Sequence, residues 1–239
     1  MKNYIKLIKA NIFYLLSKRN IILLFILNIS SILVFVYNTQ IYKGFSYLDA
    51  NRFDSLFYFE ANVFQFIKFI YVIFVVFINM SYFTGEYSNY SAYFIKNRRT
   101  KIDFYITKYL SVILLDSLEL IYLYFIQEFI KVLMPFYSFP FVNLNKYISL
   151  YVLGLFIFFL SSLILIISKS IFSSIFTIIL FWFSDILSAQ DDSFSKVLSF
   201  FFIHINDIGD IKYGILHGIY LTIILVLASI IIIKNKDTI

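Results

Sequence analysis

Two acidic residues, Asp116 and Glu119, lie inside the long apolar stretch 104–134, and their spacing places them on adjacent parts of one helix face. A charged side chain inside a bilayer is costly, so such residues are candidates for function. Carboxylates at this depth could contact a cationic substrate or relay protons. The alternative is structural, with both acids paired to cations or hydroxyls of neighbouring helices. Glu128, one turn before Lys131, is predicted to form a structural pair.

A second group of chemically distinctive residues lies in the segment 85–103, directly after another apolar stretch. Its aromatic residues recur at three- and four-residue steps, a spacing suited to anchoring a short helix in a groove of another protein. Arg98 and Arg99 could pair with acidic residues of that protein. The alternative is a positively charged loop with tyrosines at the membrane interface. The aromatic residues are Tyr87, Tyr90, Tyr93 and Phe94.

The composition defines the kind of element that must hold these residues. Of 239 residues, 61% are hydrophobic, 22% are aromatic and only 14% are charged, which no soluble domain of this size matches. About 20 apolar residues in a helix cross a bilayer core of ~30 Å, and this chain contains several such stretches. The sequence therefore predicts an all-α, polytopic integral membrane protein whose residues 1–239 form a single transmembrane domain.

Six apolar ranges are predicted as transmembrane helices: 21–37, 64–83, 104–134, 147–168, 171–187 and 213–233. The third is longer than a bilayer requires, so it should tilt or project beyond the headgroups. The fourth and fifth are joined only by Lys169 and Ser170, so they should form a tight antiparallel hairpin.

The distribution of charge predicts the orientation. Lys and Arg concentrate in the first twenty residues, in the 85–103 segment and at the C-terminal end, whereas most acids lie in the alternate connections. Because cationic loops are retained on the cytoplasmic side, we expect both termini to be cytoplasmic. The abundance of Ile, Lys, Asn, Phe and Tyr is typical of an AT-rich bacterial genome, so the expected location is a bacterial cell membrane, with multiple passes.

Two segments outside the spans are also predicted to contact the membrane. Residues 1–20 place apolar side chains on one helical face and lysines elsewhere, which indicates an interfacial amphipathic helix; the alternative is a charged leader that only sets topology. A cleaved signal is not expected, because cations recur and no small-residue cleavage site follows. Residues 188–212 are too apolar for an exposed loop and too short to span, so an outer re-entrant or interfacial segment is expected, with His204 as an interfacial aromatic.

Small hydroxylated residues form a stripe along one side of the fifth span. Such a stripe lets helices approach closely and form hydrogen bonds, and it could equally line a hydrophilic substrate route. Its members are Ser170, Ser173, Ser174, Thr177, Ser184 and Ser188.

Several classes of activity lack their motifs in this chain. There is no G-x-x-x-x-G-K-[ST] phosphate loop, no H-E-x-x-H zinc site and no cysteine. Neither His204 nor His217 lies in a recognisable Ser-His-Asp setting. The net charge of +6 is explained by topology and contact with anionic lipid, so nucleic-acid binding does not follow from it. We therefore expect neither an enzyme, nor a metal site, nor a cofactor bound by this chain.

The order of residues from 86 to 108 resembles the cytoplasmic segment that follows the second transmembrane helix of type-2 ABC transporter (ABC-2) permeases. That segment is commonly written E-Y-x-N-G-T, about ten residues, an Arg, then a Lys. Tyr90 occupies the usual glycine position, Ser91 replaces the threonine, and the proline common before the Arg is missing. The matching residues are Glu86, Tyr87, Asn89, Arg98 or Arg99, and Lys108.

The resemblance implies an ABC-2 exporter-like fold in which the 85–103 segment couples to a separate ABC ATPase. Two copies of that ATPase would bind ATP and Mg, and a second permease copy or a paralogue would complete the transporter. It implies a subunit interface between the first and fifth helices, for which the candidates are Asn28, Ser31, Ser170, Ser173, Ser174 and Thr177.

Among permeases of this length, the resemblance is to those that export bacteriocins, lantibiotics or related antimicrobial peptides, or that confer immunity to them. The expected substrate is therefore an amphipathic antimicrobial peptide or a lipid-like compound. Two alternatives remain open from the residues themselves. One is an ATP-independent carrier that uses Asp116 and Glu119, and the other is a non-transporting membrane sensor or scaffold.

Overall fold

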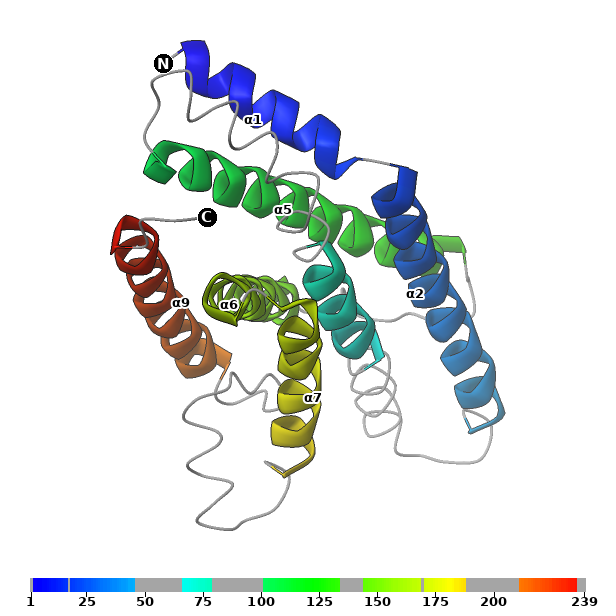
Figure 1. The fold of residues 1–239 in the computed structure, drawn as a ribbon. Helices are drawn as coiled ribbons and strands as arrows, with labels where there is room; N and C mark the ends of the chain where they lie inside the picture. The colour runs from blue at the N-terminus through cyan, green and yellow to red at the C-terminus, as the bar shows by residue number, and fades with distance from the viewer. Residues whose placement is uncertain are drawn as a thin grey trace.

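The computed structural model describes residues 2–16, 18–45, 66–78, 101–133, 144–168, 170–187 and 211–235. Within these ranges the chain is all-helical, which confirms the predicted α class (Figure 1). The helices are α1 (Lys2–Leu15), α2 (Lys18–Phe45), Phe66–Ile78, α5 (Lys101–Leu133), α6 (Leu144–Ser168), α7 (Ile171–Leu187) and α9 (Ile211–Asn235).

Each range predicted as a span overlaps one of these helices. In the described part of the chain, three segments are by themselves long and apolar enough to cross a membrane: Tyr105–Ile126 of α5, Leu144–Ser168 of α6 and Ile215–Lys234 of α9. The pair Tyr4–Leu15 and Asn20–Val34, bent by 66° at the break between α1 and α2, would raise the number to four if it were one span. The structure therefore supports a membrane protein.

Helix α6 forms the centre of the bundle. Figure 1 looks almost along its axis, with α5 above it, α9 on one side and α7 and Phe66–Ile78 on the other. It contacts α5, α7 and α9, and it is apolar all round, as a helix enclosed by others should be. The ring of Tyr109 on α5 packs against Phe158 and Phe159 of α6, with ring centroids 5.8 and 5.0 Å apart.

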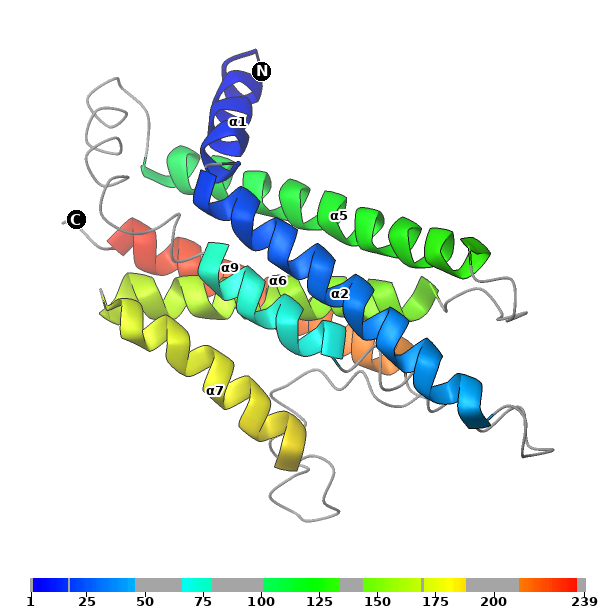
Figure 2. The same cartoon turned by 90° about the vertical axis from the view of Figure 1, so that its right-hand side faces the viewer.

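Helix α1 crosses one end of the bundle and packs against the first half of α5 (Figure 2). Its buried side chains Leu7, Asn11 and Leu15 recur every fourth residue and so share a face. At the start of both helices the Tyr4 hydroxyl donates a hydrogen bond of 2.7 Å to Asp103. The beginnings of α2, α5 and α7 and the ends of α6 and α9 lie toward this same end of the bundle.

Candidate functional site

The acidic residues Asp116 and Glu119 lie in the middle of α5, within Tyr105–Ile126. They are one turn apart on the helix face that points into the bundle, and their side chains are only 5% and 8% exposed. Because both side chains are buried, bulk water cannot stabilise a charge on them, and neighbouring protein groups must do so.

Asp116 is held by a residue of another helix. The hydroxyl of Tyr71, on Phe66–Ile78, donates a hydrogen bond of 2.5 Å to Asp116 Oδ1. Tyr71 is itself completely buried. Its ring fits beside Gly154 of α6, where an added Cβ would lie 2.5 Å from the phenol oxygen. Three helices thus meet at the Tyr71 side chain.

Glu119 is held by α2. Asn28 Nδ2 donates a hydrogen bond of 3.0 Å to Glu119 Oε1 and another of 2.8 Å to the Leu24 carbonyl on its own helix. Each carboxylate therefore receives a neutral donor from a neighbouring helix. We call Asn28, Tyr71, Asp116 and Glu119 the polar cluster.

The polar cluster has acceptor oxygens left over. Among the described residues, Asp116 Oδ2 and Asn28 Oδ1 are buried and have no hydrogen-bond partner. The two carboxyl groups also repel each other when both are charged. Two adjacent buried carboxylates are costly when both are ionised, so this site favours uptake of a proton or a cation. The described residues contain no group of three or more His, Cys, Asp or Glu that could hold a metal ion.

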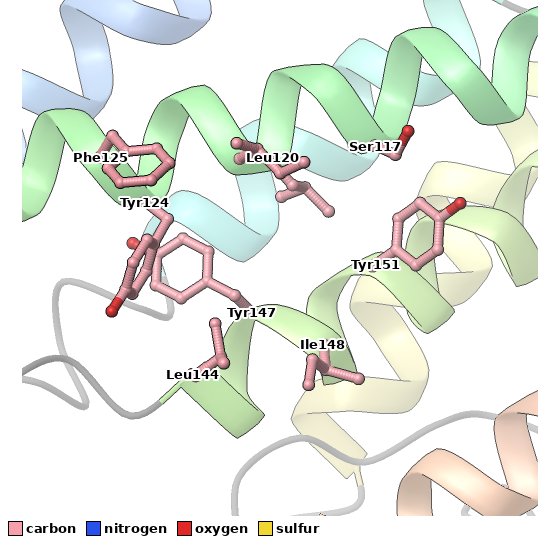
Figure 3. A pocket seen from close by; sticks show the side chains of 9 residues that line it. Ser117, Leu120, Tyr124, Phe125, Leu144, Tyr147, Ile148 and Tyr151 are labelled. Carbon is pink, nitrogen blue, oxygen red and sulfur yellow. The ribbon is translucent and has the colours of Figure 1, made fainter.

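A pocket of about 500 Å³ opens between α5 and α6 (Figure 3), and its lining includes Ser117 and Leu120, which follow Asp116 and Glu119 in the chain. Its wall is mainly apolar and aromatic, and the rings of Tyr124 and Tyr147 meet edge to face at 5.3 Å. At its other end lie Tyr151 and Ser117, the residue that follows Asp116. The Asp116 carboxylate interacts electrostatically with the Tyr151 phenol. The lining residues are Ser117, Leu120, Ile121, Tyr124, Phe125, Leu144, Tyr147, Ile148 and Tyr151.

The predicted ATPase-coupling residues fall mainly outside the described part of the chain. This holds for Glu86, Tyr87, Asn89, Tyr90, Tyr93, Arg98 and Arg99. Lys108 is described, and it is buried in the first half of α5 with its ammonium 5.8 Å from the Tyr105 ring centroid. The predicted outer segment 188–212, with His204, also lies outside the described residues apart from the start of α9.

The candidates for a subunit interface occupy different places. Ser31 and Thr177 are buried within this chain, and Asn28 is bonded to Glu119, so these three side chains face its own helices. Ser170 is half-buried in the connection between α6 and α7. The side chains of Ser173 and Ser174 lie outside the description, and a subunit contact through this stripe stays a prediction.

Sequence reasoning did not single out Tyr71, Gly154 or the tyrosines of the pocket. Tyrosine is frequent throughout the chain, with 20 copies, so one in a span carries little information. Gly154 had a usable signal, because it is the only glycine in the range 147–168 and a glycine inside a helix marks a close approach.

Comparison with known proteins does not extend these observations. The sequence matches no protein-family model, and no curated protein matches it either.

Proposed function

We propose that this chain is the membrane-spanning permease subunit of an ATP-driven ABC exporter. In this proposal six helices span a bacterial cell membrane with both termini in the cytoplasm. The subunit pairs with a second copy or a paralogue and binds two copies of an ABC ATPase, which supply ATP hydrolysis. The substrate is an amphipathic antimicrobial peptide or a lipid-like compound.

The observation that carries the proposal is the order of residues from Glu86 to Lys108, which resembles the ATPase-docking segment of ABC-2 permeases. The chain itself has no phosphate loop, so an ATP-driven mechanism needs a partner. The positions of α1 and α5 support the same reading. The two helices pack together at the end of the bundle where the 85–103 segment joins α5.

This arrangement offers a mechanical route from the ATPase to the membrane. Helix α5 is continuous over 33 residues, or ~50 Å, which exceeds a bilayer core of about 30 Å. A displacement of the 85–103 segment would act directly on the start of α5 at Lys101. Because the helix is unbroken, it would carry that displacement to Asp116 and Glu119 and to the pocket beside them.

Co-purification tests the proposal. The tagged chain is extracted from cells in mild detergent and its stoichiometric partners are identified by mass spectrometry. The matched variant carries Glu86→Ala, Arg98→Ala and Arg99→Ala, and a control carries Lys6→Ala and Lys9→Ala on the exposed side of α1. We expect an ABC ATPase with the parent and the control but not with the triple variant. Recovery of the chain without any ATPase, even after crosslinking in cells, would contradict the proposal.

A second candidate function is an ATP-independent carrier that uses Asp116 and Glu119. The polar cluster favours it, because a buried carboxylate oxygen without a partner is suited to taking up a proton or a cation during transport. Transport that persists in proteoliposomes without ATPase, and that Glu119→Gln abolishes, would support this candidate over the exporter.

A further inference from the structure

The α5–α6 pocket has the features of a ligand site. At about 500 Å³ it falls within the size range of small-molecule sites, which are mostly apolar with a few polar groups. Its mouth is bordered by Ile121, Phe125 and Ile148, whose side chains are exposed. In a membrane these side chains face acyl chains, so a hydrophobic compound dissolved in the lipid could reach the pocket sideways.

The aromatic lining and the nearby acid indicate which charge the occupant carries. Three tyrosines contribute to the wall, and the face of an aromatic ring attracts cations. Tyr151 and Ser117 line one end of the pocket (Figure 3), and the Tyr151 phenol interacts electrostatically with the buried Asp116 carboxylate. Among the described residues that line the pocket, none is a Lys or Arg. The surroundings thus favour positive charge and disfavour negative charge.

We propose that the α5–α6 pocket binds lipophilic cations, with the apolar body against Leu120, Ile121 and Ile148 and the positive charge toward Tyr151 and Asp116. A cation in this position would offset negative charge on the polar cluster. As a statement about the exported substrate, the inference rests on the proposed function. As a statement about binding, it is tested on this chain alone.

Two probes of nearly the same shape and opposite charge separate charge recognition from hydrophobic partitioning. Tetraphenylphosphonium is the cation and tetraphenylborate the anion. Equilibrium dialysis of the purified chain in detergent, corrected with protein-free micelles, measures the binding of each. No ATPase is present, so the result does not depend on whether the export proposal is correct.

Matched variants locate the site. Ile148→Trp fills the mouth of the pocket, whereas Ile223→Trp makes the same change on an exposed position of α9 outside the pocket lining. Asp116→Asn removes the charge at constant shape. We expect saturable phosphonium binding that Asp116→Asn weakens by about tenfold or more, the equivalent of losing one charge-assisted contact. Ile148→Trp should weaken it by about as much, because the larger side chain occupies space that the probe needs. Ile223→Trp should leave the affinity unchanged.

Three results would overturn the inference. They are phosphonium binding that does not saturate, phosphonium binding no tighter than borate binding, and phosphonium binding that Ile148→Trp leaves unchanged. If Asp116→Asn fails to elute as a folded protein, Tyr151→Phe and Tyr151→Leu replace it. Loss of the ring should then weaken phosphonium binding while loss of the hydroxyl alone should not, and equal affinities in these two variants would contradict the pocket's aromatic role.

Discussion

At the scale of single residues, the polar cluster is held by neutral donors from two other helices. A typical hydrogen bond contributes about 0.5–1.5 kcal/mol to stability, but a buried group left without its partner costs about 1–3 kcal/mol. The asymmetry matters here because Asp116 and Glu119 are both buried. Tyr71 and Asn28 therefore stabilise the bundle mainly because, without them, buried carboxylate oxygens would have no hydrogen-bond donor.

The hydrogen bond between Asn28 and Glu119 can be tested by exchanging the amide and the carboxylate between the two positions. Asn28→Asp places a second acid against Glu119, so we expect a loss of about 1–3 kcal/mol in the free energy of unfolding. Adding Glu119→Gln restores a donor to this contact, and the double variant should recover the part of the loss that comes from it, while the bond to the Leu24 carbonyl stays lost. Unfolding of the purified variants in mixed micelles measures both. Additive losses in the double variant would show that the two side chains do not interact.

At the scale of helices, α6 brings the other elements together because close approach is possible at Gly154. A Cβ at this position would lie 2.5 Å from the Tyr71 hydroxyl and 2.6 Å from its ring, and the ring is fully enclosed. A side chain at position 154 would therefore force the Tyr71 ring or the α6 backbone to shift. The hydrogen bond from Tyr71 to Asp116 therefore depends on the absence of a side chain on α6.

Gly154→Ala should accordingly destabilise the protein by about 1–3 kcal/mol through overpacking. The measurement is a double-mutant cycle with Tyr71→Ala, using the same unfolding assay. Because Tyr71→Ala removes the group that clashes, the cost of Gly154→Ala should largely disappear in that background. If Gly154→Ala costs as much stability in the Tyr71→Ala background, contact with the Tyr71 ring is not the cause of the loss.

Helix α1 exposes Ile5 and Phe13 by 63% and 67% although both are large and apolar. We expect the membrane interface to cover them, with Lys6 toward the headgroups. The chain contains no cysteine, so a spin label can be attached at one introduced cysteine without background. Labels at Phe13 should collide with lipid-soluble oxygen more than with a water-soluble nickel chelate, and labels at Asp191, in the predicted outer segment, should show the reverse. Equal accessibility at both positions would contradict an interfacial α1.

At the scale of the whole molecule, much of the helical framework could be predicted from apolar runs alone. The range 171–187 coincides with α7 (Ile171–Leu187), since short polar connections interrupt an otherwise continuous apolar sequence. The neighbours of each helix could not be predicted, because spans that are apolar all round have no face that identifies a partner. Tyr71 and Asp116 are 45 residues apart in the chain, and nothing in either segment predicts that they meet.

The proposed topology makes a prediction about access from each side of the membrane. A cysteine in place of Lys234, at the end of α9, should react with a membrane-impermeant maleimide only after cells are permeabilised. A cysteine in place of Asp191, in the predicted outer segment, should react in intact cells. Labelling at position 234 in intact cells would contradict the proposed topology, because it would place the C-terminal end of α9 outside the cell.

In the proposed transporter an ABC ATPase contacts the 85–103 segment, and photocrosslinking in living cells can detect that contact. A photoreactive benzoylphenylalanine replaces Tyr90, and in a matched control it replaces Leu227, an exposed apolar residue of α9. Crosslinked products are identified by mass spectrometry. The proposal predicts an ABC ATPase crosslinked from position 90 and not from position 227. Products from position 90 that contain no nucleotide-binding protein would contradict it.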